Sequence, residues 1–346
     1  MKAKVVSITA VKKPTPRLVC MTGTPVSESP LNAYSLVRLV NPSLATSKIK
    51  FNSAFTNTVE KFYGGQKKVE LDKKTPYKNL DKLRTIMSGF SIRRTLAEVH
   101  GMPKKIWMTR EVTLSPEQKK VYNTVAAKEK LGLSFSSLGE KDMGSVSLRL
   151  RQVLLDPTIL GFDAPSAKFD ALEDLASEIL EDPQAKMVVW LSFVTSMPAL
   201  LKRFKQYHPV ALYEQTTQAE IVHLNKTFDH SSCRLVFASP AKASTGVDFL
   251  ARARYAVYLD RPFSSTQWLQ SQDRLVRRVN LASTDEIELL KGSPATLIDL
   301  YAPGTVDALT HALLDRKIDL IEGSDASIGK LAMSRDEFLS FIKEIE

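Results

Sequence analysis

The stretch that most constrains the fold is residues 235–278, where two apolar runs, a loop of small residues and an arginine-bearing helix follow one another. The runs 235–238 (LVFA) and 255–259 (YAVYL) have the length and the unbroken apolar character of strands that are buried on both faces. The loop 239–248 lies between them, and a helical pattern covers residues 266–279. This order is typical of an open α/β sheet that binds its ligands at the strand ends.

Strand and helix patterns alternate in the same way around this stretch. Strands are expected at 187–191, 210–213 and 296–300, and helices at 169–180, 197–207, 218–228 and 306–321. This alternation predicts an α/β fold, a parallel sheet with helices on both faces.

The first hundred residues show a different pattern. Residues 17–21 predict a buried strand, and residues 31–39 predict a helix that Pro42 ends. Residues 46–100 show no strand pattern and predict an α-helical insertion, in which Phe51, Phe55, Val59 and Phe62 form an aromatic stripe facing its core. A strand follows at 105–114, and a helix then begins at Pro116.

Charge and cysteine content narrow the function classes. The chain carries a formal net charge of +10 with a pI of about 9.4, which points to a polyanionic partner, above all nucleic acid. A generic solubility charge is the other interpretation, and charge alone does not decide between the two. The two cysteines, Cys20 and Cys233, lie in apolar runs, so we expect buried free thiols and no metal site. No apolar run approaches the roughly 20 residues of a membrane span, so no membrane partner is expected.

The helix at 266–279 carries the candidate chemistry. Arg274 and Arg277 are three residues apart and project from neighbouring positions on one face. A guanidinium is always charged and matches phosphate oxygens through two parallel hydrogen bonds. The pair suits a phosphate ligand, and a solvated basic helix is the other interpretation.

Four residues of this helix resemble the Q-x-x-D-R-x-x-R motif VI of helicase-like ATPases: Gln270, Asp273, Arg274 and Arg277. The loop 239–248 resembles motif V, and the overall likeness is to Swi/Snf-type (superfamily two) DNA translocases. Further segments resemble the family in the family's order, namely 18–25 (motif III), 36–42, 92–95, 102–104, 112–122, 148–157, 166–168, 188–193 (motif IV) and 303–307. Val276 and the 243–244 pair (Ala-Ser) depart from the family pattern, which favours a diverged branch, with a viral origin as one interpretation.

The resemblance implies a RecA-like fold and a role for each matching residue. Arg274 and Arg277 would be the catalytic arginine fingers. Nucleotide binding would involve Gln270, Gly246, Asp248 and Asp273, and contacts with the DNA backbone would come from Thr22, Thr24, Ser192, Phe193, Thr216, Thr217, Ser239 and Lys242.

The sequence contains no phosphate loop of the form G-x-x-x-x-G-K-[ST], because the nearest match, residues 323–331, has one spacer residue too many and ends in Leu331. No acidic pair follows an apolar strand as a magnesium ligand pair would. We therefore expect ATP and Mg²⁺ to be used only with a first lobe carried by a separate polypeptide or a removed segment, and the chain alone to be inactive. A catalytically inactive nucleic-acid-binding or regulatory module is the second hypothesis, and an unrelated α/β enzyme, which the motif order disfavours, is the third.

The resemblance divides the chain into five segments. These are the tail of the first RecA-like lobe (1–45), the α-helical insertion (46–100), an inter-lobe segment (101–147), the second lobe with its bracing helix (148–322) and a C-terminal appendage (323–346). An intracellular location is expected, in the cytoplasm, or in the host cytoplasm for a viral protein.

Overall fold

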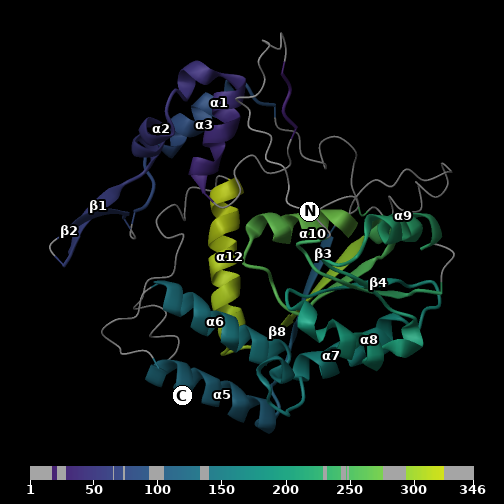
Figure 1. The fold of residues 1–346 in the computed structure, drawn as a ribbon. Coiled ribbons are helices and arrows are strands. Elements are labelled where there is room, and N and C mark those ends of the chain that lie inside the picture. Colours follow the sequence, from purple (N-terminus) through teal and green to yellow (C-terminus); the bar gives the residue numbers. More distant parts are fainter. Residues whose placement is uncertain are drawn as a thin grey trace. The chain divides into compact units, whose positions relative to one another are not determined.

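The computed structural model describes residues 18–21, 29–64, 66–72, 75–92, 105–132, 140–228, 232–242, 247, 249–275 and 294–322. The chain forms two compact units, one of residues 1–94 with 316–332 and one of residues 95–315 with 333–346 (Figure 1). Each unit is described by itself. Among the described residues, no helix is both long enough and apolar enough to cross a bilayer.

The larger unit is built on a six-stranded sheet in which every described pairing is parallel, with strand order β3-β8-β7-β4-β6-β5. The strands are β3 (Lys105–Glu111), β4 (Met187–Trp190), β5 (Val210–Leu212), β6 (Leu235–Ala238), β7 (Tyr255–Tyr258) and β8 (Ala295–Tyr301). β4 and β6 are buried at every position, as their unbroken apolar sequences predict. The predicted parallel α/β sheet is confirmed. It also includes β3, from the segment that the sequence places between the lobes.

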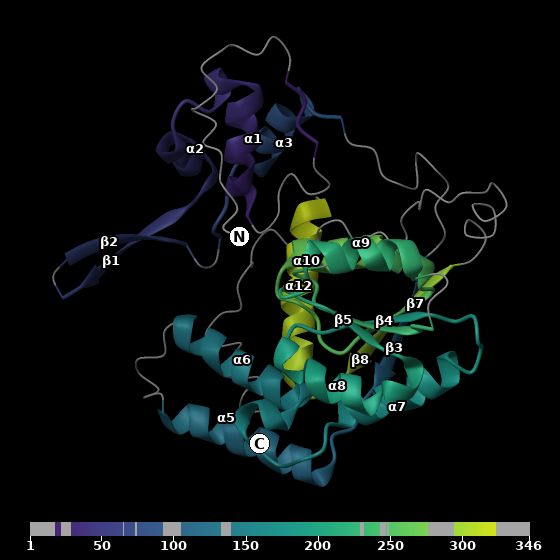
Figure 2. The same ribbon diagram turned by 45° about the vertical axis from the view of Figure 1, so that its right-hand side comes forward.

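Helices cover both faces of this sheet (Figure 1, Figure 2). α7 (Ala167–Ile179) and α8 (Met197–Arg203) lie on one face, and α9 (Gln218–Thr227) and α10 (Ser265–Leu275) lie on the other. The other described helices that contribute to this unit are α5 (Pro116–Gly132), α6 (Glu140–Leu155) and α12 (Val306–Glu322), with 3₁₀ turns at Pro157–Leu160, Val194–Ser196, Lys205–Tyr207 and Phe249–Arg252.

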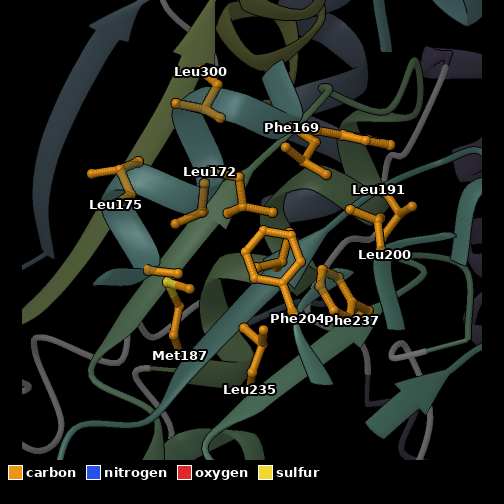
Figure 3. Packing of buried hydrophobic residues seen from close by; sticks show 14 of the residues in the cluster. Phe169, Leu172, Leu175, Met187, Leu191, Leu200, Phe204, Leu235, Phe237 and Leu300 are labelled. Atoms are coloured by element: carbon orange, nitrogen blue, oxygen red, sulfur yellow. The ribbon is translucent and has the colours of Figure 1, made fainter. Parts of the chain in front are cut away.

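The main core lies between the sheet and the α7–α8 layer. Phe169 and Leu172 of α7, and Phe204 directly after α8, pack against the sheet residues Met187 and Phe237 (Figure 3). Burying a side chain of this size contributes about 1.5–3 kcal/mol. The cluster therefore fixes α7 and α8 against the strands whose ends carry the candidate site.

A buried polar network joins α5, α7 and α12. The Lys168 ammonium, 1% exposed, lies 2.7 Å from the Asp307 carboxylate and donates to the Leu259 carbonyl oxygen, also at 2.7 Å. The Gln118 amide donates to the carbonyls of residues 153 and 154 and accepts from the Ala167 N–H. Residues from three segments that resemble separate family motifs therefore lie in one hydrogen-bonded network. The segments are 112–122, 166–168 and 303–307. We call this network the brace.

Among the described residues up to 92, the smaller unit contains the short helices α1 (Ala33–Val40), α2 (Lys48–Phe55) and α3 (Leu80–Ser88), with 3₁₀ turns at Pro30–Asn32 and Pro42–Leu44. Their core contains Val37, Phe51, Phe55 and Leu83. Phe51 and Phe55 thus occupy the predicted core positions.

The prediction of an all-helical insertion over 46–100 is wrong. β1 (Thr58–Tyr63) and β2 (Gln66–Leu71) form an antiparallel hairpin, which places Val59 and Phe62 on a strand and leaves Phe62 70% exposed. The hairpin turns at Gly64, whose φ of 55° is readily adopted by glycine. Among its described residues the hairpin has no apolar face to bury, and ion pairs between its strands, such as Lys67 with Glu60, stabilise it instead.

The predicted buried strand at 17–21 is also wrong for the described part, residues 18–21. Val19 and Met21 are 84% and 93% exposed, and no described strand pairs with them. An apolar run becomes a buried strand only where a neighbouring strand satisfies its backbone. As a result Cys20 is exposed, against expectation, whereas Cys233 is buried as expected.

Candidate functional site

The carboxyl ends of β4, β6 and β5 lie side by side. Trp190 pairs with Ala238, and Leu212 pairs with the same residue from the other side, so the three strands end at one level. The loops that follow carry six residues predicted to contact DNA: Ser192, Phe193, Thr216, Thr217, Ser239 and Lys242. We call this carboxyl end of the sheet, with these loops, the rim.

Two of the six residues hold the rim together. Ser239 is buried, its N–H donates to the Leu212 carbonyl at 2.8 Å, and its hydroxyl donates to Glu214 at 3.1 Å. Thr216 is buried too, and its hydroxyl accepts the Tyr213 N–H at 3.0 Å. These hydroxyls are occupied within the protein.

Two others reach the surface of the rim. Thr217 is exposed and begins α9 with a capping box, in which it and Glu220 satisfy each other's backbone N–H. The pKa of Glu220 is lowered, chiefly by hydrogen bonds from Thr217 and also by the charge of Lys242. Lys242 is half-buried, and its effect on Glu220 places its charge near the start of α9.

The loop after β4 is attached to a buried ion pair. The Ser192 N–H donates to one oxygen of Asp260 at 2.7 Å, and Arg151 Nη2 donates to the other at 2.5 Å. Arg151 also donates to the Arg261 carbonyl at 2.7 Å. Its guanidinium lies 4.2 Å from the centre of the Phe263 ring and 5.3 Å from that of Phe193. Asp260 was not among the residues predicted from sequence, although an acid directly after an apolar strand is a recognisable signal.

α10 is anchored to the sheet by one face. Trp268 packs on Tyr258 with ring centroids 4.5 Å apart, and the Ser271 hydroxyl lies 3.0 Å from the Tyr258 hydroxyl. Gln270 and Arg274 are one turn apart on another face and half-buried. Asp273 is ion-paired with Lys105 of β3 at 3.0 Å. The structure thus brings Gln270 and Arg274 together and places Asp273 against the edge strand.

A second cluster of charged residues lies between α10 and the sheet. Arg261 lies over Trp268 at 4.7 Å and bonds to Asp299 at 2.7 and 2.8 Å. His311 Nε2 is 3.3 Å from the Asp299 carboxylate. Burial raises the pKa of Asp299, and burial together with the charges of Arg261 and Lys168 lowers the pKa of His311 to about 3. Asp299 stands within an apolar strand and was also missed from sequence.

Five predicted site residues lie outside the described residues: Thr22, Thr24, Gly246, Asp248 and Arg277. The same holds for residues 323–346. Within the described ranges, no group of three or more His, Cys, Asp or Glu side chains is arranged to hold a metal ion.

Two family models match the sequence. The SNF2-related domain matches residues 2–159, and the helicase conserved C-terminal domain matches residues 167–279. The two matches follow one another along the chain and include the segment 239–277 on which the motif argument rests.

Similar curated proteins are cellular. The DNA repair and recombination protein RAD54 of Saccharomyces cerevisiae is 26% identical over 57% of this chain and 25% of its own length. The chromatin structure-remodeling complex subunit snf21 of Schizosaccharomyces pombe is 22% identical over 94% of this chain and 28% of its own. The chain thus spans about a quarter of each relative, and the viral origin considered from sequence is not borne out.

Solved structures share the fold. The core domain of the Sulfolobus solfataricus SWI2/SNF2 ATPase matches with a TM-score of 0.54 and 20% identity, over 90% of this chain and 62% of that one. The same ATPase core in complex with dsDNA matches with a TM-score of 0.50 and 20% identity, over 91% and 63%.

Proposed function

Because the chain belongs to the Swi/Snf-type, helicase-like proteins, we propose that it is the C-terminal part of an ATP-dependent DNA translocase. The observation that carries the proposal is that the rim and the start of α10 both lie at the carboxyl end of the parallel sheet. DNA would bind along the rim, and Arg274 of α10, together with Arg277, would face a nucleotide. Such adjacency allows one bound ligand to influence the other.

The DNA contacts would be made with phosphates. Lys242 offers an ammonium at the surface of the rim, and the Ser192–Phe193 loop flanks it. Thr217 is exposed there too, but its hydroxyl donates to Glu220 at 2.7 Å and would have to exchange this bond for one to a phosphate. Thr216 and Ser239 would act indirectly, by holding these loops. Phosphate contacts carry no sequence information, so binding would be independent of sequence and would weaken as counterions compete.

The nucleotide role belongs to α10 and the loop before β7. Arg274 and Arg277 would stabilise the negative charge that develops on the transferred phosphoryl group, with Gln270, Gly246, Asp248 and Asp273 around the nucleotide. Because the 346 residues contain no phosphate loop, this role requires ATP and Mg²⁺ held by a first lobe outside them. By themselves the 346 residues would hydrolyse no ATP.

The DNA role is tested by titrating a short duplex against the protein at several salt concentrations. Lys242→Ala should weaken binding and reduce the slope of log affinity against log salt by about 0.9, the value for one phosphate contact. The matched control is Lys205→Ala. Lys205 is exposed in the turn before β5 and so lies at the amino end of the strands, opposite the rim. Equal effects of the two substitutions, or a salt response near zero, would contradict the proposal.

A further inference from the structure

The ion pair between Arg151 and Asp260 connects three segments that are remote in the sequence. Arg151 comes from α6, Asp260 follows β7, and the Ser192 N–H lies after β4. Each oxygen of the Asp260 carboxylate accepts from a different segment. Loss of the carboxylate would therefore release the loop and the guanidinium at once.

The pair is enclosed by protein. Arg151 and Asp260 are 5% and 4% exposed, and the Phe193 and Phe263 rings flank the guanidinium. A guanidinium is planar and presents its donors in a fixed geometry, so it orders its partners more closely than an ammonium would. The same Arg151 nitrogen holds the Arg261 carbonyl, four residues before α10 begins.

The loop also contains a polar group with no partner. Within the described part of the chain, the Ser192 hydroxyl is buried and makes no hydrogen bond. An unsatisfied buried hydroxyl is uncommon and calls for an explanation. The oxygen has almost no exposed surface in this conformation, so the Ser192 side chain would have to rotate toward the rim to take a phosphate oxygen as its partner.

We infer that Arg151 and Asp260 are positioning residues, which hold the Ser192–Phe193 loop in the conformation that receives a DNA phosphate and tie that loop to the segment leading into α10. The inference rests on the proposed DNA-binding function of the rim. It adds residues that touch neither DNA nor nucleotide but determine how firmly the rim engages DNA.

The chain provides a matched control. Asp307 is 5% exposed and paired with the buried Lys168, as Asp260 is 4% exposed and paired with the buried Arg151. The backbone N–H bonded to Asp307 is that of Ala302, which is not on the rim. The same substitution, Asp→Leu, therefore removes a buried carboxylate from both sites but a rim contact from only one.

The experiment compares Asp260→Leu, Arg151→Met and Asp307→Leu with the unaltered chain, at a temperature where tryptophan fluorescence shows each protein folded. Hydrogen exchange followed by mass spectrometry measures protection of residues 190–196 without DNA. A short duplex titrated over a range of salt measures affinity and salt slope. Asp260→Asn and Arg151→Lys are the conservative variants.

We expect Asp260→Leu and Arg151→Met to speed exchange in 190–196 about tenfold, to weaken duplex binding about tenfold and to lower the salt slope by about 0.9. Asp307→Leu should have a much smaller effect on each of the three quantities. Asp260→Asn should recover most of the affinity, because its amide oxygen still accepts the Ser192 N–H, and Arg151→Lys should recover part.

Unchanged exchange in Asp260→Leu, or equal effects of Asp307→Leu on exchange and DNA binding, overturns the inference. Faster exchange with unchanged DNA affinity overturns the link to DNA, while a DNA defect in Lys242→Ala leaves the proposed function standing. If the unaltered chain binds no duplex, the proposed function fails, and the link to DNA fails with it.

Discussion

The brace between Lys168 and Asp307 offers a quantitative test of the structure. Lys168→Met leaves the Asp307 carboxylate buried without its cation, and Asp307→Leu leaves the ammonium without its anion. Removing one partner of a buried pair costs about 3–5 kcal/mol, so the two single losses sum to about 6–10 kcal/mol.

The double variant should cost much less than that sum. It buries no charge, and it leaves two groups unpaired, the Leu259 carbonyl and the Ala302 N–H. An unsatisfied buried group costs about 1–3 kcal/mol, which gives about 2–6 kcal/mol for the double variant. The midpoints of the two ranges differ by about 4 kcal/mol, which is the coupling energy that we expect.

Guanidinium denaturation followed by tryptophan fluorescence measures these losses. All three tryptophans, Trp107, Trp190 and Trp268, lie in the unit that contains the pair, so the signal reports that unit. Single losses below about 1 kcal/mol, or losses that add within about 0.5 kcal/mol as they do for independent sites, would refute the buried-pair geometry.

Two further predictions concern the support of α10. His311 has a pKa of about 3 in the folded protein and near 6.5 in the unfolded protein. Between these pH values the unfolded state binds more protons than the folded state. The free energy of unfolding should therefore fall as the pH drops from 6.5 to 4, by up to about 1.4 kcal/mol per pH unit. His311→Gln should flatten this dependence in denaturation series across that range, and an unchanged slope would count against it. Ser271→Ala removes the partner of the buried Tyr258 hydroxyl and should cost about 1–3 kcal/mol; a loss near zero would show that the contact contributes nothing.

The parallel sheet was readable from the sequence because its strands are unbroken apolar runs. The interpretations of 235–238 and 255–259 matched β6 and β7 to within one residue. The hairpin β1–β2 was missed because its strands carry several lysines and glutamates, and the residues of β2 are nearly all exposed. The buried strand predicted at 17–21 was wrong because apolar character alone does not supply a neighbouring strand for pairing.

The rim was predictable in outline, since parallel strands place their carboxyl ends at one edge. Which rim residues face solvent was not, because Ser239 and Thr216 differ from Thr217 only in the groups that surround them. The Arg151–Asp260 pair joins residues 109 positions apart, and no local pattern encodes such a contact.

The central claim is that Arg274 and Arg277 act on nucleotide and the rim acts on DNA. The most direct test is the kcat of DNA-stimulated ATP hydrolysis, measured with a first lobe that carries a phosphate loop. Arg277→Ala should lower kcat by about 10³ or more, as expected for an arginine finger, with little change in DNA affinity. Arg277→Lys should not restore activity, and the neighbouring Arg278→Ala should have a small effect. Equal losses in Arg277→Ala and Arg278→Ala, or losses confined to DNA affinity, would identify the helix as a basic DNA-contact surface and contradict the account.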